Sequence, residues 1–131
     1  MIVDSSALIA VLKAEDGAVD ILGVLEGARG RMSMSSATYL QAGIVVDRHL
    51  EAADAARLDE LIGEFEIGIA DTTADHTRIA RHAYRLFGKH SGHPAALNFG
   101  DCFAYALAKA TGEPLLFKGY DFTRTDIVPA L

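Results

Sequence analysis

Short apolar segments typical of strands alternate with longer helical segments along most of the chain, and this alternation restricts the fold more than any other feature. The first segment, residues 1–3, reads "MIV" and is followed by a helical pattern over residues 5–14. Strands are also expected at residues 31–36, 66–71 and 114–119, with a last short one at 126–130. Helices are also expected at residues 16–28, 37–50, 54–65, 75–89 and 101–112. Strands separated by helices favour an α/β fold with a central parallel sheet covered on both faces.

Length and composition indicate one globular domain. The chain has 131 residues, half of them hydrophobic, so we expect residues 1–131 to fold as a single domain around one full core. No apolar run is long enough to span a membrane, and the N-terminal stretch has no basic lead of the kind that secretory signals carry. The single cysteine, Cys102, excludes an internal disulfide and stands among apolar residues, as structural thiols do. We therefore expect a cytoplasmic protein.

The charge of the chain is unevenly distributed. A formal net charge of −6 argues against a general nucleic-acid binder. Residues 76–100 nevertheless contain no Asp or Glu, and their four cations are spaced three, four and four residues apart, which puts them on one helical face. Such a basic stripe is either a solvated face or a surface that meets phosphate groups, and spacing alone leaves both interpretations open. The four cations are Arg78, Arg81, Arg85 and Lys89.

Three acidic residues stand where a parallel sheet gathers its ligands. Asp4 ends the first strand, Asp101 opens the helix before the strand at 114–119, and Asp121 follows that strand. An acid in the first turn of a helix also favours the helix dipole, so Asp101 alone has a purely structural explanation. Because the carboxyl ends of parallel strands share one edge of the sheet, we expect the three carboxylates to converge. Clustered carboxylates need a compensating cation, and Mg²⁺ or Mn²⁺ suits oxygen ligands and assists the hydrolysis of phosphodiesters.

The segments that carry these acids resemble the PIN-domain ribonucleases, in particular the VapC-type toxins of bacterial toxin–antitoxin pairs. The similar stretches read "MIVDSSALIAVL", "SSATYLQAGIVVDRHL" and "LNFGDCFAYALAKATGEPLLFKGYDFTRTDI", and they run nearly from end to end of the chain. The resemblance implies a three-layer α/β/α fold and Mg²⁺- or Mn²⁺-dependent cleavage of RNA. It also implies a homodimer and a cognate antitoxin that blocks the active site.

The resemblance assigns roles to individual residues. Asp4, Asp101 and Asp121 match the acids of the family's metal site. Ser6 would support Asp4, and Asp126 would be a peripheral acid. Lys118, beside the expected site, is either a phosphate contact or a solvated lysine at a strand end.

One position departs from the family pattern. The glutamate that the family carries in its third helix corresponds to Gln41, which keeps a carbonyl oxygen but has no charge. Gln41 belongs to a natural but weakened site, to a degenerate binding module, or to a protein changed deliberately to silence a toxic nuclease. The two functions that follow are a metal-dependent endoribonuclease toxin and a weakened or silent PIN-like domain that binds antitoxin or RNA without cleaving. A phosphatase with Asp4 as nucleophile would need a second acid at position 6, where Ser6 stands.

Overall fold

Four short parallel strands form the centre of the molecule. The computed structural model describes residues 1–131, and its sheet has the order β3-β2-β1-β4 with every neighbouring pair parallel. In the register, Ile2 lies opposite Ser33 on one side and Leu115 on the other. The strands are β1 (Ile2–Val3), β2 (Met32–Ser35), β3 (Ile67–Ala70) and β4 (Leu115–Leu116). The expectation of a central parallel sheet is confirmed.

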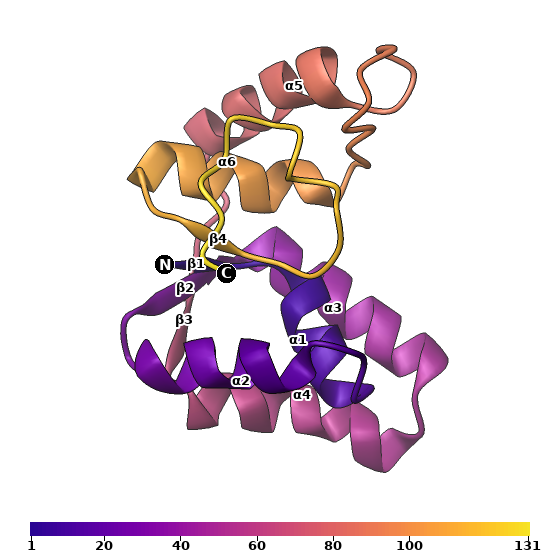
Figure 1. Cartoon of the computed structure of the whole chain (residues 1–131), viewed down its shortest axis with the longest axis vertical. Coiled ribbons are helices and arrows are strands. Elements are labelled where there is room, and N and C mark those ends of the chain that lie inside the picture. Colours follow the sequence, from indigo (N-terminus) through magenta and orange to yellow (C-terminus); the bar gives the residue numbers. More distant parts are fainter.

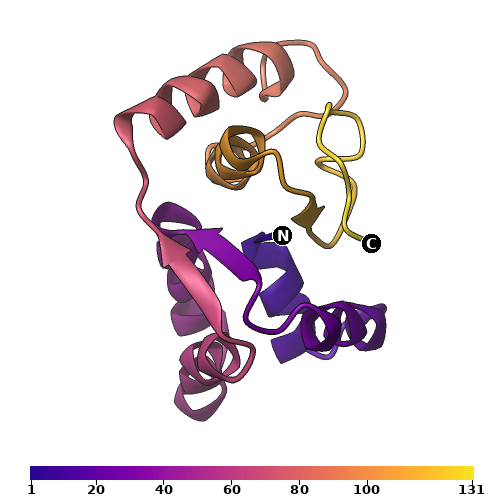
Figure 2. The ribbon, with the colours of Figure 1, turned by 90° about the vertical axis from the view of Figure 1, so that its left-hand side faces the viewer.

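Six helices cover the two faces of this sheet, which gives three layers (Figures 1 and 2). The pair α5 and α6 lies on one side, and α1 to α4 lie on the other. The helices are α1 (Ser5–Leu12), α2 (Ala18–Gly27), α3 (Ser36–His49), α4 (Ala52–Glu64), α5 (Ala74–Phe87) and α6 (Asp101–Thr111). No helix is long and apolar enough to cross a membrane.

Strands β1 and β4 each contribute to two separate apolar cores, because successive side chains of a strand point to opposite faces of the sheet. Val3 and Leu116 pack into the core beneath α1 to α4. Their neighbours Ile2 and Leu115 pack into the core beneath α5 and α6. All four side chains are fully buried, which explains why these strands are uniformly apolar rather than alternating.

The structure differs from the sequence expectations at two chain segments that bear on function. The helix expected over residues 75–89 ends at Phe87, because Gly88 turns into extended backbone, so Lys89 lies outside the helix. The last expected strand, at residues 126–130, is reduced to one parallel bridge between Leu115 and Pro129. In this bridge the Leu115 N–H donates to the Val128 carbonyl and the Ala130 N–H donates to the Leu115 carbonyl, each at 2.9 Å, so the bridge tolerates a proline at position 129.

Candidate active site

A cleft of about 300 Å³ lies at the carboxyl ends of β1 and β4. Its walls bring together the three predicted acids and Gln41, from segments that lie far apart in the sequence. Ser6 and Lys118, which were predicted to support the site, also line this cleft. The remaining lining residues are Ser5, Ile9, Glu15, Val45, Asn98 and Phe122.

Asp4 connects β1 to α1 and is the most enclosed of the acids. Its Oδ2 accepts hydrogen bonds from the backbone N–H of Ser6 at 3.0 Å and from the Ser6 hydroxyl at 2.6 Å, so Asp4 caps the helix. Burial raises its pKa, although the bonds from Ser6 act in the opposite direction. Its second oxygen, Oδ1, is buried without any hydrogen-bond partner. An unpaired carboxylate oxygen in a buried position is costly unless a cation or a water meets it.

Ser6 joins the ends of two strands. While its hydroxyl donates to Asp4, the same oxygen accepts a hydrogen bond from the backbone N–H of Lys118 at 3.0 Å. Lys118 follows β4, so this one hydroxyl fixes the Asp4 carboxylate relative to the loop that carries Asp121. The predicted supporting position of Ser6 therefore has a geometric basis.

Asp101 is held at the start of α6 by a reciprocal pair of bonds with Asn98. Its Oδ2 accepts from the backbone N–H of Asn98 at 2.9 Å, and its own N–H donates to Oδ1 of Asn98 at 2.8 Å. Burial raises the pKa of Asp101 to about 7, and the negative charges of Asp4 and Asp121 act in the same direction. The three acids are therefore close enough to influence one another electrostatically, which a purely dipole-related role for Asp101 does not explain.

Gln41 reaches the cleft from α3 and rests against the chain before α6. Its Oε1 accepts a hydrogen bond of 3.3 Å from the Ser5 hydroxyl. A Cβ atom at Gly100 would overlap the Gln41 side-chain amide, so the glycine allows the close approach of α3 to the start of α6. The amide therefore occupies a defined position at the rim of the acidic cleft.

Glu15 and Asn98 line the cleft but were missed by sequence reasoning. Glu15 is turned toward the cleft at the end of α1, where Ala14 adopts a positive φ of 50° and the Glu15 N–H donates to the Ala10 carbonyl at 2.9 Å. A residue with positive φ just after a helix is usually glycine, so the alanine at position 14 did not indicate this turn in the sequence. The Asn98 role could have been found from the "NFGD" spacing, which places an amide three residues before an acid at a helix start.

The donor set of the cleft fits a hydrated divalent ion. No three His, Cys, Asp or Glu side chains are arranged to enclose a metal ion by themselves. Mg²⁺ and similar ions keep several of their waters, however, and are commonly held by one or two carboxylates. The unpartnered Oδ1 of Asp4, with Asp101 and Asp121 along the same cleft, provides oxygen ligands and the negative charge that such an ion requires.

Asp126, which was predicted to be a peripheral acid of the site, does not line this cleft. Its carboxylate accepts hydrogen bonds from the Tyr105 hydroxyl at 2.7 Å and from Nζ of Lys109 at 2.8 Å. The bond from Lys109 and then that from Tyr105 lower the pKa of Asp126. The four residues between Asp121 and Asp126 carry the chain from the cleft to the α6 residues Tyr105 and Lys109, so Asp126 anchors the C-terminal segment instead.

Asp126→Asn is therefore expected to leave RNA cleavage unchanged and to lower stability by no more than about 1 kcal/mol, because the ion pair is half exposed. A lowered pKa stabilises the fold above the ordinary pKa of the acid, and this contribution disappears as the pH falls through the folded-state value. The difference in melting temperature between wild type and variant should thus be largest near pH 7 and vanish in acid. A stability difference that persists in acid would contradict this role; exposed Glu60→Gln is the matched control.

The predicted basic stripe is divided by the end of α5. Arg78, Arg81 and Arg85 lie on one exposed face of this helix, and Arg78 pairs with Asp75 at 2.5 Å. Arg81 and Arg85 have no ion-pair partner in the chain. Lys89 lies beyond the helix, where its charge lowers the pKa of Asp101. The four cations therefore form a helical group of three and a separate lysine closer to the acids.

Known proteins of one family are similar to this chain over nearly its whole length. The family model described as PIN domain matches residues 1–128. The chain belongs to the PIN-domain family. Ribonuclease VapC28 of Mycobacterium tuberculosis is 49% identical to this PIN domain over 131 residues, which are 100% of the chain and 98% of that protein. Ribonuclease VapC42 of the same organism is 43% identical over 130 residues, covering 99% of this chain and 98% of that protein.

Solved structures support the PIN-domain fold. The crystal structure of Mycobacterium tuberculosis VapC20, a toxin that cleaves the sarcin–ricin loop, matches with a TM-score of 0.76 at 15% identity, covering 97% of this chain and 95% of that one. A chain of a toxin–antitoxin complex from Klebsiella pneumoniae matches with a TM-score of 0.70 at 14% identity, covering 95% and 92%. At these identities the likeness concerns the fold alone, and the predicted three-layer α/β/α fold is confirmed.

Proposed function

We propose that this PIN domain is an endoribonuclease toxin that uses Mg²⁺ or Mn²⁺ and is controlled by a cognate antitoxin. The observation that carries the proposal is the cleft in which Asp4, Asp101 and Asp121 meet, with a buried and unpaired Oδ1 on Asp4. Relatives that span nearly the whole chain at 41–49% identity are named VapC ribonucleases, which supports the same activity here.

In this proposal some residues of the cleft bind a metal ion and others contact the RNA. Asp4, Asp101 and Asp121 would hold the ion directly or through its waters. When bound, the ion supplies a water of lowered pKa and stabilises negative charge that develops on the phosphate. Ser6 keeps Asp4 in place relative to β4, and Lys118 places a positive charge on the cleft wall where an RNA phosphate would enter.

Gln41 moderates this site rather than abolishing it. The amide oxygen already accepts a hydrogen bond from Ser5, and the amide adds no charge to the cleft. A carboxylate at the same position would attract a divalent ion more strongly. We therefore infer that ion binding is weaker than a glutamate would give, while the three remaining carboxylates keep the cleft competent for hydrolysis.

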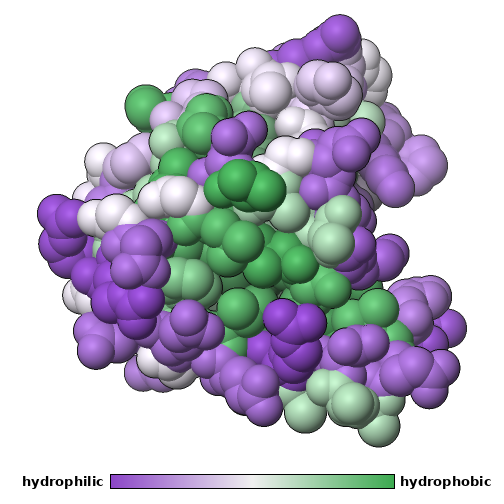
Figure 3. All heavy atoms as spheres, turned by 60° about the horizontal axis from the view of Figure 1, so that its bottom comes forward, coloured by the Kyte–Doolittle hydropathy of each residue, from purple (hydrophilic) through white to green (hydrophobic).

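Two protein partners are part of the proposal, an antitoxin and a second copy of the chain. On the side of α2 and α4, the surface carries a continuous apolar patch bordered by polar side chains (Figure 3). Partly buried apolar side chains on these two helices include Leu22 and Ile62. A patch of this kind on a small domain is typical of a protein-binding surface, and we propose that an antitoxin segment covers it.

The proposed activity is tested by incubating the purified chain with total cellular RNA in Mg²⁺, in Mn²⁺ or in EDTA. Cleavage in either metal that EDTA abolishes is expected. Equal cleavage with EDTA would contradict a metal-dependent reaction. A complete lack of cleavage in both metals, by a protein with a normal melting transition, would favour a domain that only binds.

The arginines of α5 are proposed to meet RNA phosphates. Replacing Arg81 and Arg85 together by Ala is expected to weaken RNA binding and to reduce the slope of log affinity against log salt by about 1 to 2, because each phosphate contact releases condensed counterions. Binding is measured by fluorescence anisotropy from low to physiological salt. Arg57→Ala, on α4, serves as the control for loss of charge elsewhere. An unchanged slope would contradict phosphate contacts by these arginines and would show that this face of α5 is only solvated.

A further inference from the structure

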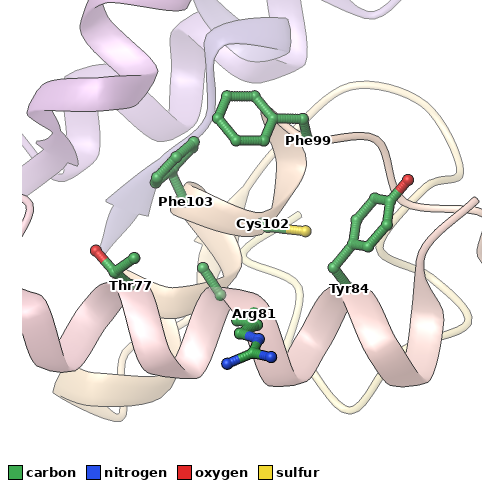
Figure 4. Close-up of a pocket in the computed structure, with 7 residues that line it drawn as sticks. Thr77, Arg81, Tyr84, Phe99, Cys102 and Phe103 are labelled. Carbon is green, nitrogen blue, oxygen red and sulfur yellow. The ribbon is translucent and has the colours of Figure 1, made fainter.

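Tyr120 is the most exposed large apolar or aromatic side chain of the molecule, at 85%. Phe99 follows among the aromatic residues at 77%, but its ring meets Phe103 edge to face at 5.0 Å beside an apolar pocket of about 240 Å³ (Figure 4). Tyr120 pairs with no other aromatic ring and lines neither this pocket nor the apolar pocket between α3 and α6. Packing within the chain therefore gives no reason for an aromatic side chain at position 120.

The loop that carries Tyr120 is held in place at both of its ends. The rings of Phe117 and Phe122 lie with their centres 5.1 Å apart, and Phe122 is buried in the core beneath α5 and α6. The carbonyl of Tyr120 accepts hydrogen bonds from the backbone N–H of Thr123 at 3.1 Å and from the Thr123 hydroxyl at 2.7 Å. The backbone below the exposed ring is thus fixed, so a ligand that contacts the ring orders little of the chain on binding.

The same loop forms part of the acidic cleft. Lys118 and Asp121 both line the cleft, and the backbone of Tyr120 is joined directly to that of Asp121, with about 3.8 Å between successive Cα atoms. Lys118 and Arg124 are exposed, and neither forms an ion pair within the chain. Between Lys118 and Arg124 the loop therefore places a free aromatic ring between two free cations, beside an acid of the proposed metal site.

We propose that Tyr120 is a stacking platform for an unpaired base of the RNA, next to the phosphate that the cleft receives. Surfaces that bind single-stranded RNA combine cations for the phosphates with aromatic rings on which the bases stack. This inference rests on the proposed ribonuclease function. Tyr120 is a positioning residue in it, since the ring contacts a base beside the reacting phosphate and takes no part in the hydrolysis.

The neighbours of the ring favour RNA over a protein segment as its ligand. A protein-binding patch gathers several exposed apolar side chains, whereas the residues that flank Tyr120 are Lys118, Gly119 and Asp121. Every base has a π-face, so a stacking platform accepts any of the four bases. Bases inside a double helix are already stacked on both sides. The platform should therefore select for an unpaired nucleotide beside the cleavage site rather than for its identity.

The platform is tested by the affinity for a single-stranded RNA oligonucleotide in Mn²⁺, measured by fluorescence anisotropy. The measurement uses the Asp101→Asn background so that the RNA stays intact. Adding Tyr120→Ala is expected to weaken binding by about 5-fold to 100-fold, the usual range for the loss of one stacked base. Tyr120→Phe and Tyr120→Trp should keep the affinity, because each retains an aromatic face. Val19→Ala, which shortens an equally exposed side chain on α2, is the control.

An unchanged affinity for Tyr120→Ala would overturn the platform. So would an equal loss in Tyr120→Phe, because it would assign the contact to the hydroxyl group instead of the ring. A fully paired RNA duplex of the same length should bind Tyr120→Ala as well as it binds the parent protein. Thermal melts check that all variants are folded.

Abasic RNAs separate stacking from a structural role of Tyr120. In a set of oligonucleotides that each lack one base, a single position should weaken binding severalfold when Tyr120 is present. The same position should make no further difference in Tyr120→Ala, because the ring and the base act as a pair. Losses that simply add at every position would overturn stacking.

The proposed function and the platform fail in different ways. A wild type that neither binds nor cleaves single-stranded RNA would overturn the ribonuclease function and the platform together. A wild type that cleaves RNA in Mn²⁺ and is inhibited by EDTA, while Tyr120→Ala binds and cleaves with the same KM, would overturn the platform alone.

Discussion

Asp101→Asn is expected to lower metal-dependent RNA cleavage by at least about 100-fold, since even the loss of a partner outside the direct ligands of a metal costs 10–100-fold. The same change should stabilise the protein in EDTA. Asp101 is buried at the start of α6 beside two further acids, and the amide removes a charge that burial and these neighbours disfavour. The amide oxygen can still accept the hydrogen bond from the Asn98 N–H, so the helix start is preserved.

The pH dependence separates this electrostatic effect from a change in packing. The pKa of Asp101 is raised from 3.8 to about 7 in the metal-free fold, so the folded state binds a proton more tightly than the unfolded state does. The stability of the wild type in EDTA should therefore fall as the pH rises from about 4 to about 7, and Asp101→Asn should show a smaller fall. Thermal melts at several pH values measure this. Undiminished cleavage by the variant, with EDTA still inhibiting, would show that Asp101 is not part of the metal site.

Gln41→Glu is expected to tighten Mg²⁺ or Mn²⁺ binding by about tenfold or more and to raise RNA cleavage. The new carboxylate can keep the bond from the Ser5 hydroxyl and would stand at the rim of the cleft shared by the three acids. Without metal it adds a further negative charge beside the acids of the cleft, so it should slightly destabilise the fold. With metal the sign of the effect reverses, because the ion neutralises the cluster.

Paired thermal melts of the wild type and Gln41→Glu, in EDTA and in excess Mn²⁺, test this reversal. The variant should melt below the wild type in EDTA and above it in Mn²⁺. Gln41→Leu is a useful control, since it removes the polar group without adding charge. If the carboxylate changes neither the metal affinity nor the two melting temperatures, position 41 lies outside the influence of the ion.

The strand-ending acids were predictable because topology alone brings them together. Asp4 and Asp121 follow neighbouring parallel strands, and Asp101 starts the helix that precedes β4, so no loop conformation was needed to predict that they meet. Asp126 shows the opposite case. Its position depends on the course of a loop that leaves the cleft, and the bonds from Tyr105 and Lys109 determine where it ends.

The positions of two further residues, Lys89 and Glu15, could not be predicted from the sequence for similar reasons. Lys89 fitted the helical spacing of the arginines, but spacing cannot tell where a helix stops, and Gly88 ends α5 before it. Glu15 enters the cleft because Ala14 adopts a left-handed backbone conformation, which few residues other than glycine signal in advance. Periodicity predicts which face a residue takes, whereas helix ends and loops decide whether it reaches the site.

The two-residue strand β1 determines how the molecule can open. The side chains of Ile2 and Val3 belong to different cores. The backbone N–H of Ile2 donates to the Pro114 carbonyl at 2.8 Å, and the backbone N–H of Asp4 donates to the Leu116 carbonyl at 2.9 Å. Releasing the Asp4 amide therefore exposes apolar surface from both cores at once. The layers on the two faces of the sheet should unfold as one cooperative unit, and the Asp4 amide should exchange its hydrogen only on global unfolding. The carboxylate that anchors the site is thus attached to a backbone segment that can open only when both cores open.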